Sequence, residues 1–73
     1  MPLRPLPFQE VRRRLERAGF SLASQKGSHV KFIKQLEQGT LTTIVPQHRE
    51  IAVGTLRSIL RQAGISPEQF DSL

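Results

Sequence analysis

The stretch from Phe20 to Pro46 constrains the fold more than any other part of this 73-residue chain. Its apolar and β-branched residues form three short runs separated by glycine-containing segments, which is typical of β-strands joined by tight turns. The predicted strands are Phe20–Lys26, His29–Lys34 and Thr40–Val45, with a turn at Gly27–Ser28 and a hairpin loop at Gln35–Gly39. Pro46 ends the third strand, because it has no amide hydrogen to donate to a neighbour. Three consecutive strands with such short connections predict an antiparallel meander.

A helix over residues 7–18 is predicted before the strands. Its apolar residues recur at helical spacing, and Pro7 suits the first helical position, where its missing amide hydrogen is not needed. Residues 1–6 contain two prolines and predict an irregular leader. The rest of the chain, residues 7–73, is then a single small domain.

Two further helices are predicted after the strands. Apolar residues recur at helical spacing from Leu56 to Ala63, and Gly64 ends this helix. Ser66 and Gln69 have the spacing of a capping box, which predicts a short final helix.

The order α-β-β-β-α, followed by the short helix, predicts an α+β fold in which two helices cover one face of a three-stranded antiparallel sheet. The other face of the sheet stays open to solvent. Alternation along the second strand directs Val30 and Phe32 towards the helices, and His29 and Lys31 towards the open face. Ile33 shares that open face.

The excess of basic residues narrows the classes of partner. The chain has 11 Lys and Arg residues against 6 Asp and Glu, a net charge of +5, which favours nucleic acid, an acidic protein or an anionic membrane surface. Solubility alone would also account for the charge. There is no cysteine, and the two histidines and six acidic residues lack metal-ligand spacing, so neither a disulfide framework nor a structural zinc site is expected.

Membrane association is not expected from the hydropathy of the chain. Its apolar stretches fall well short of the ~20 residues that span a bilayer. The N-terminal residues also lack the apolar core of a signal peptide. We therefore expect a cytoplasmic protein.

Five short motifs together resemble the HicA family, the small mRNA-interferase toxins of HicA–HicB toxin–antitoxin pairs, also called YcfA-like proteins. The motifs are Gly19–Phe20, Lys26–His29, Val45–His48, Gly54–Leu60 and Ala63–Ile65, in the family's order and spacing. The resemblance covers nearly the whole chain after Pro7. It implies a double-stranded-RNA-binding-like fold and ribonuclease activity centred on the histidine of the Gly-Ser-His motif, here His29. It also implies a HicB-like antitoxin that inhibits the toxin by covering the active-site surface.

The chemistry of RNA cleavage independently suits His29. RNA carries its own nucleophile, the 2′-hydroxyl group, and needs a base to take its proton, cations for the developing phosphorane charge and an acid for the leaving oxygen. Because the chain has few carboxylates to hold Mg²⁺, we expect a reaction without a metal or other cofactor. His29 as general base would leave a 2′,3′-cyclic phosphate end on the RNA.

Several other residues are candidates for RNA binding. They are Lys26, Ser28, Lys31, His48, Arg57 and Arg61. Lys26 and Lys31 flank His29 and could stabilise negative charge on the phosphate, or they are ordinary solvated strand residues. Ser28 either caps its turn or binds a phosphate, and Gly27 supplies the turn that positions His29.

His48, the second histidine, either contacts RNA, orders its loop or acts as the catalytic acid. Arg57 and Arg61 lie one turn apart on the predicted helix, as a phosphate-binding edge requires.

Two alternatives to a nuclease remain open from the sequence. A non-catalytic RNA-binding module would suit the same fold and charge. A basic interaction protein for an acidic partner would suit the charge without any RNA.

Overall fold

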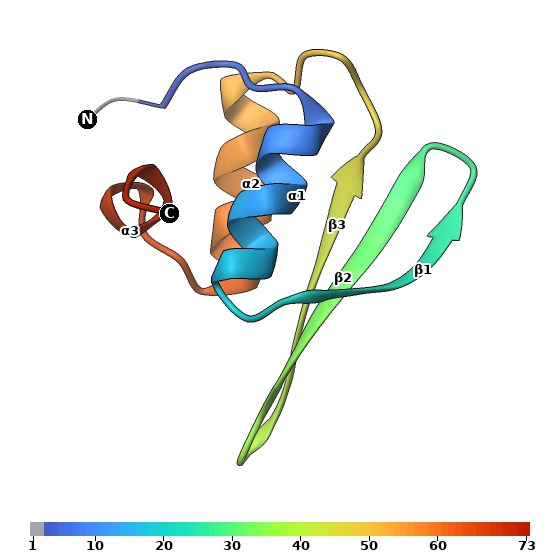
Figure 1. The fold of residues 1–73 in the computed structure, drawn as a ribbon, viewed down its shortest axis with the longest axis vertical. Coiled ribbons are helices and arrows are strands. Elements are labelled where there is room, and N and C mark those ends of the chain that lie inside the picture. The colour runs from blue at the N-terminus through green and yellow to red at the C-terminus, as the bar shows by residue number, and fades with distance from the viewer. Residues whose placement is uncertain (1–2) are drawn as a thin grey trace.

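A computed structural model describes residues 3–73 of the chain. It contains helices α1 (Phe8–Arg17), α2 (Val53–Ala63) and α3 (Pro67–Asp71), and strands β1 (Ser21–Lys26), β2 (His29–Leu36) and β3 (Gly39–Pro46). Helices α1 and α2 lie side by side on one face of the sheet, and α3 follows beside them (Figure 1). This arrangement confirms the predicted α+β fold. Helix α1 begins one residue later than predicted, because Pro7 is its N-cap and not its first helical residue.

The sheet is an antiparallel meander in the order β1-β2-β3. The hairpin loop predicted at Gln35–Gly39 is wrong in extent, because β2 continues to Leu36 and β3 begins at Gly39. Only two residues, Glu37 and Gln38, form the turn between them. Gln35 and Thr40 pair across the two strands, and the Thr40 hydroxyl group donates a hydrogen bond to Gln35 Oε1 (3.1 Å). Polar residues are tolerated in this hairpin because its end is exposed.

The core lies between the helices and the sheet. Val30 and Phe32 of β2 are buried, whereas His29 and Lys31 are exposed, which confirms the predicted alternation. The predicted apolar positions of α1 and α2 are buried as well: Phe8, Val11 and Leu15, and Leu56, Ile59, Leu60 and Ala63.

Helix α2 also covers the outer edge of β3. The buried Thr43 hydroxyl group donates to the Ile59 carbonyl oxygen (3.0 Å). The side chain of Gln62 accepts a hydrogen bond from the Ile44 amide at Oε1 (3.1 Å). These bonds satisfy polar groups that a covered strand edge would otherwise leave without partners.

The segment before α1 is irregular, as expected for residues 1–6, but it is attached to the core. Leu6 forms an isolated antiparallel bridge with Ile51, through Leu6 N to Ile51 O (3.2 Å) and Ile51 N to Leu6 O (2.6 Å). The Leu6 side chain is only 7% exposed. The part of the predicted leader at Met1 and Pro2 lies outside the described residues.

Two of the arginines of α1, Arg13 and Arg14, connect this helix to the C-terminal part of the chain. Glu10 accepts hydrogen bonds from Arg13 (2.6 Å) and Arg14 (2.8 Å). The Arg14 guanidinium lies 4.8 Å from the centroid of the Phe70 ring and donates to the Phe70 carbonyl oxygen (3.3 Å). Arg13 donates to the carbonyl oxygen of Leu73 (3.2 Å). This cluster attaches α3 and the residues after it to α1.

The Glu10 contacts predict an acid-sensitive contribution to stability. Hydrogen bonds from Arg13 and then Arg14 lower the pKa of Glu10 from 4.5 to about 2. A carboxyl group with a lowered pKa stabilises the fold fully above its unfolded value and loses that contribution as the pH falls from about 4.5 towards 2. We expect wild type to lose more stability than Glu10→Gln over this range, measured as the urea midpoint at pH 6 and pH 2.5. Equal losses of stability in wild type and Glu10→Gln would contradict a stabilising role for the ion pairs of Glu10 with Arg13 and Arg14.

Candidate nucleic-acid interface

The turn between β1 and β2 delivers His29 to the surface. Lys26 and His29 pair across the two strands, and Gly27 and Ser28 are the two residues that connect them. Gly27 has a φ of 60°, and among residues 3–73 only glycines have positive φ. Glycine at the first central position of a two-residue hairpin is the pattern of a type II′ turn. A Cβ atom at Gly27 would meet nothing within 4 Å, so backbone conformation rather than space requires glycine here.

His29 lies between two basic side chains on the outer face of the sheet. It is the first residue of β2 and pairs with Lys26 on β1 and Pro46 on β3. Directly paired residues in antiparallel strands have Cα atoms about 4.5–5.5 Å apart, and Lys31 follows about 6.6 Å along the same face. His29, Lys26 and Lys31 are all exposed. The structure therefore brings together three of the residues that the sequence singled out.

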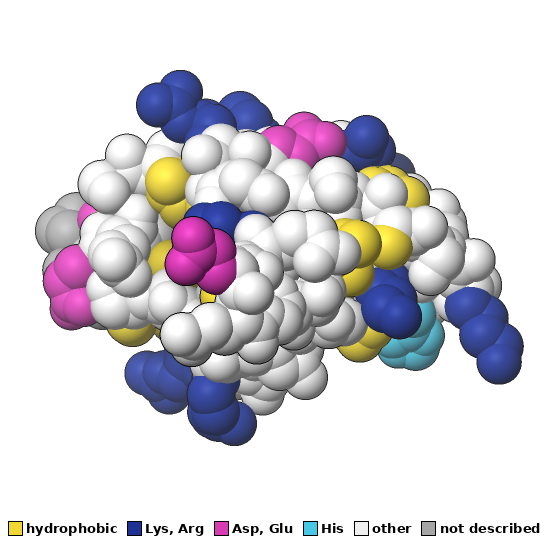
Figure 2. Space-filling model, turned by 90° about the horizontal axis from the view of Figure 1, so that it is seen from below, with side chains coloured by type: hydrophobic (Ala, Val, Ile, Leu, Met, Phe, Trp, Pro, Cys, Tyr) yellow, Lys and Arg dark blue, Asp and Glu magenta, His cyan; other side chains and the backbone are white. Residues whose placement is uncertain are grey.

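This outer face, which we call the open face, is basic and partly apolar. Besides the lysines it carries Ser24, Ile33, Thr42 and Ile44, which pair across the strands on the same side as Lys31 or His29. The three strands contain no Asp or Glu. Figure 2 shows a histidine at one end of the molecule beside Lys or Arg and hydrophobic side chains, and away from the carboxylates seen in that view. A basic surface of this kind is better suited to binding a phosphate backbone than to binding a cation.

The loop after β3 is bonded to the histidine turn. The Gln47 amide donates to the Ser28 carbonyl oxygen (2.6 Å). The Gln25 side chain donates from Nε2 to Gln47 Oε1 (2.8 Å) and to the Gly27 carbonyl oxygen (3.0 Å). The turn and the loop consequently lie at the same end of the molecule (Figure 1). Sequence reasoning assigned no role to Gln25 or Gln47, because only the folded chain places them beside the turn.

His48 belongs to the same end of the molecule. Its side chain is exposed, and its carbonyl oxygen accepts a hydrogen bond from the Phe8 amide at the start of α1 (3.0 Å). The His48 amide bonds the Pro46 carbonyl oxygen (2.9 Å). The backbone of His48 therefore orders the loop and the start of α1, while its imidazole is left for other contacts. Ser28 is likewise exposed in the turn.

Arg57 and Arg61 are placed apart from this group. Both are exposed on α2, which belongs to the helix layer, whereas His29 lies on the open face of the sheet. The two arginines are one turn apart on the helix, as expected. The structure does not bring them onto the surface that His29 occupies.

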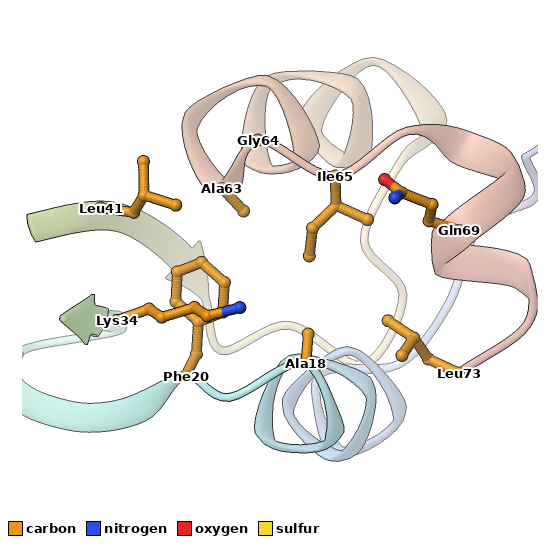
Figure 3. A pocket seen from close by; sticks show the side chains of 9 residues that line it. All are labelled: Ala18, Phe20, Lys34, Leu41, Ala63, Gly64, Ile65, Gln69 and Leu73. Carbon is orange, nitrogen blue, oxygen red and sulfur yellow. The ribbon is translucent and has the colours of Figure 1, made fainter. Parts of the chain in front are cut away.

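Two hollows in the surface are lined by residues other than those of the open face. One, of about 220 Å³, lies between the ends of the helices and the β2–β3 hairpin, where Phe20, Leu41 and Ile65 line it (Figure 3). Lys34 is the basic residue in its wall, and its Nζ atom is 6.0 Å from the centroid of the Phe20 ring. Lys34 belongs to the same strand as His29 but points to the helix side. The second hollow is near His48 and is described below.

The described part of the chain, residues 3–73, has no group of three or more His, Cys, Asp or Glu side chains placed to hold a metal ion. None of its helices is both long and apolar enough to cross a bilayer.

Comparison with known protein families gives a match. A family model described as the HicA toxin of bacterial toxin–antitoxin systems matches residues 8–65, a span that contains His29, His48 and all three strands. No curated protein matches the chain.

Proposed function

The chain belongs to the family of HicA toxins of bacterial toxin–antitoxin systems, and on this premise we propose that it is an endoribonuclease that cleaves mRNA. The observation that carries the proposal is the placement of His29. This histidine is exposed directly after a two-residue turn, close to Lys26 and Lys31, on strands without acidic residues. An imidazole in a basic setting can take a proton from a hydroxyl group while a nearby phosphate stays bound.

In the proposed reaction His29 acts as general base. Its imidazole takes the proton of a 2′-hydroxyl group, and the 2′-oxygen attacks the adjacent phosphorus atom. The bond from phosphorus to the 5′-oxygen breaks, leaving a 2′,3′-cyclic phosphate on one product and a 5′-hydroxyl group on the other. The leaving oxygen takes its proton from water or from His48. No step requires a metal ion, because the nucleophile is part of the substrate.

The surrounding residues have supporting roles in this proposal. Lys26 and Lys31 would stabilise the negative charge that builds up on the phosphate in the transition state. Ser28, exposed in the turn, would donate a hydrogen bond to a phosphate oxygen, and Gly27 would hold the turn in shape. Arg57 and Arg61 lie in the other layer and would contact only RNA that wraps around the molecule.

Membership of a toxin–antitoxin family also implies an antitoxin as partner. We propose a HicB-like protein that covers the open face and keeps RNA away from His29. An exposed basic face without acidic residues suits a partner that presents carboxylates. Both mRNA and such an antitoxin would be met in the cytoplasm, where we place the protein.

The proposal is tested by incubating the purified chain with mRNA in the presence of EDTA and analysing the ends. We expect cleavage to continue, because no step uses a metal ion, and to yield 2′,3′-cyclic phosphate and 5′-hydroxyl ends. An RNA with a 2′-deoxy nucleotide at the cut should resist cleavage. Products with only 3′-hydroxyl ends, or activity abolished by EDTA, would contradict the mechanism. RNA binding without any cleavage would favour the non-catalytic RNA-binding module.

A further inference from the structure

A second hollow lies where the loop after β3 meets the start of α1, at the same end of the molecule as the histidine turn (Figure 1). Its volume is about 280 Å³, and it is lined by Pro7, Phe8, Gln9, Gln47, His48 and Arg49. We call it the loop hollow. All of these residues except Phe8 are exposed, so their side chains are accessible to a ligand.

The loop hollow is directly connected to the turn that carries His29. Gln47, which forms part of its wall, donates from its amide to the Ser28 carbonyl oxygen (2.6 Å). The Gln47 side chain is held by Gln25, which also bonds the Gly27 carbonyl oxygen. Gln47 thus belongs both to the wall of the loop hollow and to the hydrogen bonds of the turn that precedes His29.

The lining of the loop hollow has the chemistry of a base-binding site. Imidazole and guanidinium groups, here His48 and Arg49, are among the side chains on which unstacked RNA bases stack. The Gln9 amide offers hydrogen-bond donors and an acceptor to the edge of a base, and Gln47 offers its Nε2 donors, since its Oε1 accepts from Gln25. Pro7 adds an apolar wall. The volume lies just below the roughly 300–1,000 Å³ of pockets for drug-sized ligands, which suits a single base.

We propose that the loop hollow binds the base of a nucleotide next to the cleaved phosphate, and so selects where single-stranded RNA is cut. This inference rests on the proposed function. His48 would then be a base-stacking residue, with Arg49 assisting it. An acidic side chain of the antitoxin is the competing occupant. It would pair with Arg49 and accept a hydrogen bond from an amide NH2 group, but it has no ring on which His48 could stack.

The frame of the loop hollow should survive truncation of its side chains. It is set by backbone bonds, from Phe8 N to His48 O and from His48 N to Pro46 O, and by the Leu6–Ile51 bridge. Alanine supplies the same backbone groups as His48 and Arg49. The double substitution His48→Ala, Arg49→Ala therefore tests the site without removing its frame, and a circular dichroism melting curve checks that the fold persists.

The experiment measures RNA binding in a His29→Ala background, so that the RNA stays intact. A fluorescent ten-nucleotide RNA is prepared with a single abasic position at each site in turn, and binding is followed by fluorescence anisotropy. We expect one abasic position, next to the cut found with wild type, to weaken binding about tenfold, because a stacked base is lost. When His48→Ala and Arg49→Ala are added to His29→Ala, RNA with this abasic position should bind as well as the other abasic RNAs. Arg17→Ala, which removes an exposed charge in the last turn of α1, should leave it in place.

The outcomes separate this inference from the nuclease proposal. Equal binding of all abasic RNAs, or a position effect that persists without His48 and Arg49, would overturn the base site even if wild type cleaves RNA. If a poly-glutamate peptide binds in a manner that depends on His48 and Arg49 while every abasic RNA binds equally, the occupant is an acidic protein instead. A position effect that these residues control, without any cleavage by wild type, would support the base site and overturn the nuclease. No RNA binding would contradict both.

Discussion

Replacement of His29 by alanine is expected to lower the rate of RNA cleavage by about 10²–10⁴-fold, the usual contribution of a positioned acid–base group. The loss should fall on the rate of bond cleavage and not on RNA affinity, because Lys26 and Lys31 remain on the open face. Single-turnover cleavage at saturating RNA measures the rate of bond cleavage. Fluorescence anisotropy with an uncleavable RNA measures the RNA affinity. The fold should persist, since the His29 side chain is exposed.

The control for this substitution is Gln35→Ala. Gln35 is an exposed residue at the other end of the same strand and on the same face, so its removal changes the surface but not the site. Added imidazole should restore part of the activity of His29→Ala, because a free base can enter the space left by the side chain. A fully active His29→Ala protein would refute the proposed mechanism. An inactive protein that has also lost RNA affinity would indicate a binding role instead.

Replacement of Phe32 by alanine is expected to destabilise the protein by about 3–5 kcal/mol, the usual range for a buried Phe. Phe32 is 0% exposed at the centre of the sheet, and its ring lies 6.3 Å from that of Phe8, centroid to centroid. A domain of this size is stable by only about 4–11 kcal/mol. The substitution should therefore unfold a large fraction of the molecules at 37 °C. Urea unfolding followed by circular dichroism gives the difference in the free energy of unfolding.

Leu36→Ala provides the comparison for Phe32→Ala. Leu36 belongs to the same strand and the same face, but its side chain is 47% exposed near the end of the hairpin. Its removal should cost less than about 1 kcal/mol, because little apolar surface is returned to water. Similar losses for the two variants would show that the core is not centred on Phe32.

Most of the fold was predictable from the sequence because each element has a local cause. Periodic apolar residues specified the helices, and the Ser66–Gln69 capping box forms as predicted, with both of its hydrogen bonds present. The strands of the β2–β3 hairpin are longer than predicted, because a run of polar residues is also typical of a loop. At an exposed hairpin end, polar pairs such as Gln35 and Thr40 satisfy the strand pattern equally well.

The site was predictable only in part. Alternation placed His29 and Lys31 on one face, and the two-residue turn placed Lys26 opposite His29, because both follow from local geometry. The separation of Arg57 and Arg61 from His29 agrees with the predicted layers, since the helices cover one face of the sheet and His29 lies on the other. The hydrogen bonds that Gln25 and Gln47 make at the histidine turn were not predictable, because they join different elements of the fold.

The sequence by itself therefore determined the order of the elements, the buried and open faces of the sheet and the exposure of His29. These depend on contacts between residues close together in the chain. Only the tertiary structure decided that Gln47 and His48 adjoin the histidine turn, that the arginines of α1 hold α3, and that Gln62 covers the edge of β3. Each of these contacts joins residues at least 18 positions apart. Such contacts depend on how the helices pack on the sheet, which no local pattern records.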